Sequence, residues 1–196
     1  MIIHEPSWKS YMVLSTGPIF SIEECNKLME TGRKLPPVDA QIGTASDNPK
    51  TIIKDHKIRK TNIAWLPFDQ LPWVYARLEH WMHAVNNKHM GFNQLQIGEM
   101  AQFTFYSKKH HYDWHSDSAY IMEKAPMVRK MSMIALLNDP KEFTGGELQL
   151  VNDKRSLPLK QGYGVFFASF IAHRVVPVKK GIRSSLTVWF GGPPLV

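Results

Sequence analysis

The residues best suited to chemistry are two histidines and an aspartate in the second half of the chain. His115-Ser116-Asp117 forms a His-x-Asp motif. On a β-strand, side chains i and i+2 point to the same face, so the imidazole and the carboxylate can meet at one ion. After Asp117 the chain has a single further histidine, His173. Together the three side chains would make a 2-His-1-carboxylate set, which is typical of an Fe(II) site.

The motif has two possible registers. His111 and Asp113 repeat the spacing of His115 and Asp117 four residues earlier. All four positions have the same parity, so one extended strand would direct all four side chains to a single face. The chain also has nine histidines, which makes a chance match easy. Spacing alone therefore leaves both registers open.

An arginine follows the distal histidine. Arg183 stands ten residues after His173 and opens the last predicted strand. A guanidinium at that depth can bind a carboxylate through two parallel hydrogen bonds. An anionic co-substrate bound beside a metal ion would need such a group.

Two helices are predicted before these residues. Ser21 and Glu24 fit a capping box, so the first helix begins there and runs to about Lys34, before two prolines. A second helix is expected from Leu71 to His89, ending at Gly91 as its C-cap. Its apolar residues recur with the spacing of one buried helix face: Val74, Leu78, Trp81, Met82 and Val85.

The segment between the helices is polar. Residues Val38 to Asn62 include Gly43, Asp47, Asn48 and Pro49. We expect a long loop that leads into a short strand at Ile63 to Leu66. Loops of this length are often lids or binding elements, and a surface insertion without a role is the alternative.

From Leu95 onward, short runs of aromatic and β-branched residues alternate with turn residues. The predicted strands are Met100 to Tyr106, Tyr112 to Ser116, Met131 to Leu137, Glu147 to Val151, Val165 to Ala168, His173 to Val178 and Ser185 to Phe190. Such a series predicts a sandwich or barrel. We expect a mostly β fold (α+β) with a jelly-roll core and N-terminal helices packed on one outer face. In this single domain, residues 1–94 supply the helices and an access loop, and residues 95–190 form the core.

Composition limits the classes of protein. The 196 residues are 43% hydrophobic and 11% aromatic, which excludes global disorder. The net charge of +7 favours an acidic partner: nucleic acid, an anionic surface or a small carboxylate. One cysteine, Cys25, excludes an intramolecular disulfide. Since we find no signal peptide and no span-length apolar segment, we expect a cytoplasmic protein with no membrane role. Oligomeric state is not predicted.

The second half of the chain resembles a known family. Its features are the run Tyr112 to Asp117, Leu137-Asn138 followed by Gly145-Gly146-Glu147-Leu148, and His173 with Arg183. Residues 95–190 thereby resemble the 2-oxoglutarate- and Fe(II)-dependent oxygenases, in their prolyl 4-hydroxylase-like branch. The N-terminal helices and the segment Ile58 to Leu66 also resemble the entry region of this family. The resemblance implies a double-stranded β-helix core.

The resemblance also implies roles for individual residues. Trp114-His115-x-Asp117 matches the family better than His111-x-Asp113, so His115, Asp117 and His173 are the implied metal ligands. Arg183 would hold the far carboxylate of 2-oxoglutarate. Tyr106 and Ser185 are similar to further co-substrate contacts, with a cross-strand aromatic and an ordinary strand serine as the alternatives. Tyr112, Trp189 and Arg59 are the candidates for the substrate pocket. An aromatic on a terminal strand, such as Trp189, is more often a core residue, and a basic residue at a strand start, such as Arg59, is more often solvated. Several family members have a tyrosine where this chain has Leu136, which implies a less polar co-substrate pocket.

The implied activity is hydroxylation of an unactivated C–H bond. Its cofactor and co-substrates would be Fe(II), 2-oxoglutarate and O2, with ascorbate left open, and its products would include succinate and carbon dioxide. A prolyl residue in a peptide or protein is the leading substrate. The alternatives are a nucleic-acid or small-molecule oxygenase, which the basic charge permits, and a non-catalytic jelly-roll binding module.

Overall fold

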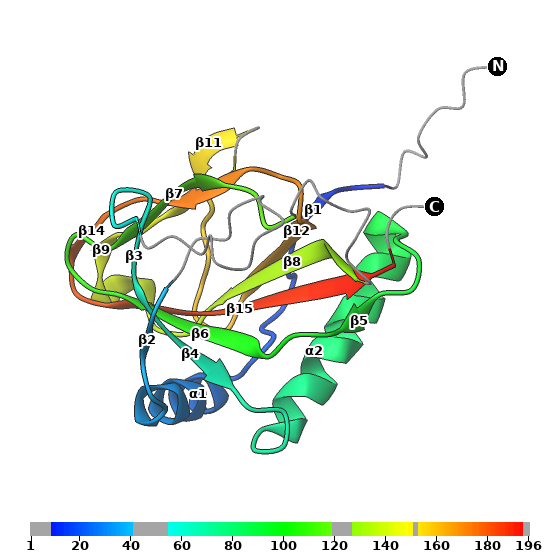
Figure 1. The fold of residues 1–196 in the computed structure, drawn as a ribbon, viewed down its shortest axis with the longest axis horizontal. Helices are drawn as coiled ribbons and strands as arrows, with labels where there is room; N and C mark the ends of the chain where they lie inside the picture. Colours follow the sequence, from blue (N-terminus) through cyan, green and yellow to red (C-terminus); the bar gives the residue numbers. More distant parts are fainter. Residues whose placement is uncertain (1–8, 41–54, 119–126, 151–152, 194–196) are drawn as a thin grey trace.

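Two antiparallel sheets lie face to face, and two helices lie beneath the larger one (Figure 1). The computed structural model describes residues 9–40, 55–118, 127–150 and 153–193. This arrangement confirms the expected fold class, which is mostly β with helices on one outer face. No helix in these ranges has the length and apolar character needed to cross a membrane.

The larger sheet carries most of the strands. Its order is β1 (Met12–Leu14), β12 (Gly164–Ala168), β8 (Val128–Leu136), β15 (Arg183–Gly192), β6 (Ala101–Tyr106), β4 (Asn62–Leu66) and β2 (Val38–Asp39), with β5 (Gln96–Ile97) also paired to β15. The smaller sheet has the order β11 (Asp153–Ser156), β10 (Leu148–Leu150), β13 (His173–Val175), β7 (His111–His115) and β3 (Arg59–Lys60). A separate hairpin joins β9 (Thr144–Gly145) to β14 (Val178–Lys180).

The helices begin and end close to the predicted positions. Helix α1 spans Ile22–Lys34, and its capping box is present: the Ser21 hydroxyl accepts from the Glu24 N–H at 3.2 Å, and the Glu24 carboxylate accepts from the Ser21 N–H at 2.9 Å. Helix α2 spans Pro72–Val85 and continues as a π turn over Asn86–Met90. Gly91 ends it in the left-handed conformation with φ 72°, as expected of a C-cap.

The two faces of the larger sheet differ in chemistry because side chains alternate along each strand. One set of residues packs on the helices and is apolar: Ala101, Phe103, Met131, Met133, Ala135, Leu186, Val188 and Phe190. The intervening positions face the smaller sheet and are rich in buried polar groups: Gln102, Thr104, Ser132, Arg183 and Ser185. The space between the two sheets therefore contains polar side chains that could bind a ligand, in addition to apolar core residues.

The contact of α1 with the sheet allows a test of the packing. Gly32 faces the ring of Phe103, and a methyl group added at Gly32 would lie 2.3 Å from that ring. We expect Gly32→Ala to lower the free energy of unfolding by about 1–3 kcal/mol, the usual effect of overpacking, despite the better helix propensity of alanine. Urea denaturation measures this. Gly17→Ala is the matched control, because its methyl group would meet nothing within 4 Å. A stabilised Gly32→Ala variant would contradict the packing.

Two sequence predictions need correction. The strand expected from His173 to Val178 is divided into β13 and β14, with Pro177 between them; proline cannot donate to a ladder hydrogen bond. The expected loop over Val38 to Asn62 carries strands at both ends, since β2 pairs with β4 and β3 pairs with β7. The proposed lid falls largely on residues 41–54, outside the described residues.

Candidate metal centre

Three side chains meet between the two sheets. His115 ends β7, Asp117 follows two residues later, and His173 begins β13, directly opposite His115 in the ladder. The Nε2 atom of His115 lies 3.8 Å from Oδ1 of Asp117, and Nε2 of His173 lies 3.6 Å from Oδ2 of Asp117. One ligand atom from each residue lies within 4.8 Å of the others. Within the described ranges, this is the group that could hold a metal ion.

A β-bulge in β7 separates the two copies of the His-x-Asp motif. His173 pairs with His115, but Val175 pairs with Tyr112, so the ladder shifts by one residue. Because of this shift, Tyr112 and His115 share a face and their rings stack with centroids 3.4 Å apart. The expectation that all four His and Asp side chains share one face is therefore wrong. The nitrogens of His111 instead approach the carbonyl oxygens of Lys57 and Lys109, at 2.9 and 3.2 Å, on the exterior.

Both imidazoles at the centre are held in the orientation a metal ligand needs. The Nδ1 atom of His115 lies 2.7 Å from the carbonyl oxygen of Asp113, and Nδ1 of His173 lies 3.0 Å from that of Ile171. Donation from Nδ1 to these carbonyls leaves each Nε2 lone pair available to an ion. Burial, together with the imidazole of His173, lowers the pKa of His115 to about 3. His115 is thus neutral at physiological pH, which is the form that binds metals.

The carboxylate of Asp117 is supported from the larger sheet. Burial would raise its pKa, but the imidazoles of His173 and His115 and a hydrogen bond from Ser132 hold the pKa below the usual range. The Ser132 hydroxyl donates to Oδ2 of Asp117 at 2.7 Å and lies 2.9 Å from the hydroxyl of Ser169. The Asp117 N–H also donates to the Ser169 carbonyl. Sequence reasoning missed both serines, because a serine within an apolar strand carries no local signal of its partner.

This support gives a prediction about Ser132. Removing its hydroxyl leaves the buried carboxylate without a charge-assisted hydrogen bond, so we expect Ser132→Ala to weaken Fe(II) binding by about 10- to 100-fold. Competition with a metal-sensitive dye measures the affinity. Ser184→Ala is the matched control, because Ser184 is equally buried and its hydroxyl has no partner among the described residues. Equal affinities in the two variants would show that Ser132 does not support the ligand.

The three predicted pocket residues differ in how they relate to this centre: Tyr112 stacks on His115, Arg59 covers Tyr112, and Trp189 pairs in the ladder with Ser132. The Arg59 guanidinium covers the ring of Tyr112 at 4.4 Å and donates to Oε1 of Gln102 at 2.7 Å. The alternative prediction, that Arg59 is a solvated residue, is wrong, because Arg59 is only 9% exposed. Trp189 is 6% exposed, its ring lies 6.2 Å from that of Trp65, and its indole N–H has no hydrogen-bond partner among the described residues.

Arg183 and its neighbours form a second polar group on the inner face of the larger sheet. Arg183 pairs with Tyr106 across β15 and β6, its guanidinium lies 5.4 Å from the Tyr106 ring, and it donates to the Ser185 hydroxyl at 2.9 Å. All three residues are buried. Burial lowers the pKa of Arg183, but a guanidinium keeps its charge at neutral pH. Tyr106 is therefore both a cross-strand aromatic and a neighbour of the cation.

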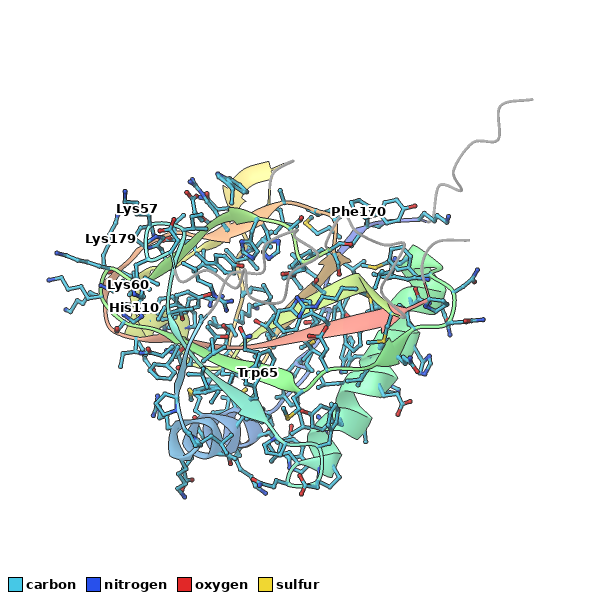
Figure 2. All side chains as sticks on the ribbon, in the orientation of Figure 1. Lys57, Lys60, Trp65, His110, Phe170 and Lys179 are labelled. Carbon is cyan, nitrogen blue, oxygen red and sulfur yellow. The ribbon has the colours of Figure 1, made fainter. Side chains whose placement is uncertain are left out.

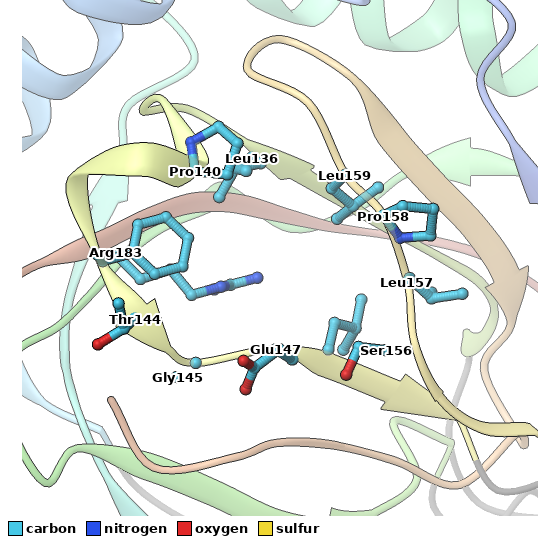
Figure 3. Close-up of a pocket in the computed structure, with 13 residues that line it drawn as sticks. Leu136, Pro140, Thr144, Gly145, Glu147, Ser156, Leu157, Pro158, Leu159 and Arg183 are labelled. Atoms are coloured by element: carbon cyan, nitrogen blue, oxygen red, sulfur yellow. The ribbon is translucent and has the colours of Figure 1, made fainter. Parts of the chain in front are cut away.

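A cavity of about 460 Å³ adjoins the guanidinium of Arg183 (Figure 3). Its lining includes Leu136, Leu148, Leu157 and Leu159, with Glu147 as the other charged residue. A buried cation in a mostly apolar cavity is suited to binding the carboxylate of a small ligand.

The donor set of the centre fits a divalent ion of the first transition series. An ion about 2.1 Å from each donor would separate two donors by at most about 4 Å. The 3.8 and 3.6 Å separations between imidazole and carboxylate atoms satisfy this limit, and the two imidazole nitrogens, which lie within 4.8 Å of each other, would draw together around the ion. Two imidazoles and one carboxylate are the ligand set of non-haem Fe(II) sites.

Comparisons with known proteins agree with this geometry. Residues 101–191 match the family model described as the 2OG-Fe(II) oxygenase superfamily. A PKHD-type hydroxylase of Synechococcus sp. (strain JA-2-3B'a(2-13)) is 22% identical over 181 residues, which cover 91% of this chain and 77% of the relative. Another, from Shewanella frigidimarina, is 30% identical over 92 residues. That second match covers 44% of this chain and spans less than half of the relative, 41% of its length.

Solved structures share the fold. A viral collagen prolyl hydroxylase from Paramecium bursaria Chlorella virus-1 superimposes with a TM-score of 0.70 at 19% identity, covering 93% of this chain and 97% of that one. A prolyl-4-hydroxylase from Pseudomonas putida gives a TM-score of 0.67 at 20% identity, covering 93% and 92%. These matches confirm the expected double-stranded β-helix core.

Proposed function

We propose that this protein is an Fe(II)- and 2-oxoglutarate-dependent dioxygenase, because residues 101–191 match the family model of the 2OG-Fe(II) oxygenase superfamily. Members of this superfamily use Fe(II), 2-oxoglutarate and O2. The observation that carries the proposal is the buried cluster of His115, Asp117 and His173, in which both imidazoles turn Nε2 toward the carboxylate.

One group of residues would bind the metal, and a second group would bind the co-substrate. When bound, iron would supply the oxidising chemistry with O2 and 2-oxoglutarate: one oxygen atom of O2 would enter a C–H bond of the substrate, and the other would enter succinate as 2-oxoglutarate loses carbon dioxide. His115, Asp117 and His173 would hold the metal. Arg183, assisted by Ser185 and Tyr106, would bind the far carboxylate of 2-oxoglutarate.

Aromatic rings that pack on the two imidazoles exclude water from the centre. Tyr112 stacks on His115, and the ring of Phe167 lies edge-on to His173 with centroids 4.7 Å apart. A low-dielectric wall on each imidazole strengthens the charge interactions inside the site. Arg59, Tyr112 and Trp189 would then form the side of the pocket that receives the substrate.

We infer a prolyl residue of a peptide or protein as the substrate. Support comes from the relatives, which include a collagen prolyl hydroxylase and a prolyl-4-hydroxylase by name. The test is incubation of the Fe(II)-loaded protein with 2-oxoglutarate and a panel of prolyl peptides, with mass spectrometry as the readout. We expect one added oxygen atom on proline and succinate formed in step with it. If 2-oxoglutarate is turned over but no prolyl peptide stimulates the turnover, the protein is a dioxygenase whose substrate is not a prolyl peptide. Stimulation by oligonucleotides would favour a nucleic-acid oxygenase.

A further inference from the structure

Six exposed lysines gather at one end of the two-sheet core. They come from three separate parts of the chain: Lys57 precedes β3 and Lys60 belongs to it, Lys108 and Lys109 lie between β6 and β7, and Lys179 and Lys180 belong to β14. Figure 2 shows three of them, Lys57, Lys60 and Lys179, together with His110. We refer to these six residues as the lysine cluster.

Backbone hydrogen bonds hold the three segments together. The Lys109 N–H donates to the carbonyl of Val178 at 2.8 Å, and the Val178 N–H donates to the carbonyl of His110 at 3.0 Å. Lys60 pairs with His111 in the ladder of β3 and β7. The pKa of His110 is lowered, first by burial and then by the charge of Lys60. The cluster is thus a fixed feature of the fold.

The charges of the cluster are not neutralised within the described part of the chain. Cations elsewhere form ion pairs, such as Lys34 with Glu30, Arg77 with Glu24 and Arg129 with Glu99. None of the six lysines is in such a pair among the described residues. Three acids lie near the cluster, Asp55, Asp113 and Glu142, and they accept hydrogen bonds from the N–H groups of Lys57 and Trp114 and from the amide of Asn138. Six lysines beside three carboxylates leave an excess of positive charge. The net charge of +7 is therefore concentrated here in part.

The lysine cluster borders the strand that carries Arg59. Side chains alternate along β3, so Lys60 faces the exterior while the Arg59 guanidinium lies inside, 4.4 Å from the centre of the Tyr112 ring. Tyr112 in turn stacks on the metal-centre residue His115. Because β3 is the edge strand of the smaller sheet, a polypeptide bound along the cluster would reach Arg59 and Tyr112 by passing around this edge.

We propose that the lysine cluster binds an acidic segment of the polypeptide substrate that flanks the residue to be hydroxylated. This inference rests on the proposed function and names a property of its substrate. Exposed lysines are compact, hydrated charges that attract carboxylates and raise the rate of encounter without demanding one geometry.

A polypeptide fits the surface better than a nucleic acid does. Proteins that bind single strands combine basic residues with aromatic rings on which the bases stack. Among the described residues, the exposed aromatic side chains are Phe68 and Phe170. Phe68 lies in the turn before α2, and Phe170 lies away from the cluster in Figure 2. The cluster itself therefore offers charge without an exposed stacking platform.

The test measures binding of two labelled peptides of equal length, with one central proline flanked by glutamates or by glutamines. Fluorescence anisotropy is recorded at low and at physiological salt, without iron or 2-oxoglutarate. We expect the wild type to prefer the glutamate peptide. A quadruple variant replaces four lysines of the cluster with glutamine: Lys57→Gln, Lys60→Gln, Lys179→Gln and Lys180→Gln. We expect this variant to bind the glutamate peptide about 20-fold more weakly and with a smaller dependence on salt.

The matched control removes four charges elsewhere, by changing Lys27, Arg33, Lys34 and Lys88→Gln, and should leave the preference intact. Circular dichroism establishes that both variants fold. Equal binding of the two peptides by the wild type, or equal losses in both variants, would overturn the proposal. Tighter, cluster-dependent binding of a single-stranded oligonucleotide of equal charge would overturn it in favour of a nucleic acid. Because these readouts need no turnover, an inactive wild type would contradict the proposed function alone.

Discussion

His115→Ala is expected to abolish Fe(II)-dependent turnover of 2-oxoglutarate. The variant leaves Asp117 and His173 as the remaining pair of a three-residue cluster. Loss of even an outer-sphere partner of a metal ligand typically costs 10- to 100-fold in affinity or activity, so loss of a ligand should exceed about 100-fold. Succinate formation measures turnover, and calorimetry with Fe(II) under anaerobic conditions measures metal binding.

His111→Ala is the matched control for this prediction. His111 belongs to the same strand and the same repeated motif, but its nitrogens face the carbonyls of Lys57 and Lys109. We expect this variant to keep wild-type affinity for Fe(II). The reverse pattern, with affinity lost in His111→Ala and kept in His115→Ala, would place the metal four residues upstream and contradict the bulge in β7.

Arg183→Ala is expected to raise the KM for 2-oxoglutarate by about 30-fold or more. Removing one partner of a buried charge pair costs about 2–5 kcal/mol, and Arg183 is 2% exposed beside the cavity. Fe(II) affinity should stay unchanged, because the guanidinium is not part of the three-residue cluster. Steady-state kinetics with varied 2-oxoglutarate measures the effect, and Arg183→Lys should recover part of it by restoring the charge without the forked donor geometry.

Arg174→Ala provides the control for loss of one positive charge. Arg174 lies on β13 but contacts Trp114 and Gln149, and it is not among the residues that line the cavity. We expect its KM for 2-oxoglutarate to match that of the wild type. An Arg183→Ala variant with unchanged KM would mean that the co-substrate carboxylate binds elsewhere.

Much of the fold follows from local rules that a sequence displays directly. The capping box at Ser21, the apolar stripe of α2 and the left-handed Gly91 are each determined by residues within a few positions of one another. Six strands of the second half, β6, β7, β8, β10, β12 and β15, were also predicted to within three residues at each end. The short strands β5, β9 and β11 were not predicted, and the strand expected from His173 to Val178 is divided at Pro177. Alternation along these strands places polar residues on the inner face.

The site was less predictable where it depends on contacts between distant segments. The bulge in β7 is seen only in the pairing of β7 with β13, which lies about sixty positions later in the chain. The residue types between Tyr112 and His115 do not by themselves predict a bulge. The support of Asp117 by Ser132 joins two sheets. Arg59 reads as a solvated residue at a strand start, and its burial against Tyr112 and Gln102 follows only from the pairing of β3 with β7.

The most direct test of the dioxygenase is an anaerobic titration of the metal-free wild-type protein with Fe(II) and 2-oxoglutarate. Chelation of Fe(II) by 2-oxoglutarate produces a weak visible absorption band, which reports the assembled centre. We predict a band that saturates at one Fe(II) and one 2-oxoglutarate per chain. Absence of the band, with no stoichiometric binding of Fe(II), would contradict the account and indicate a jelly-roll binding module whose histidines and aspartate are structural.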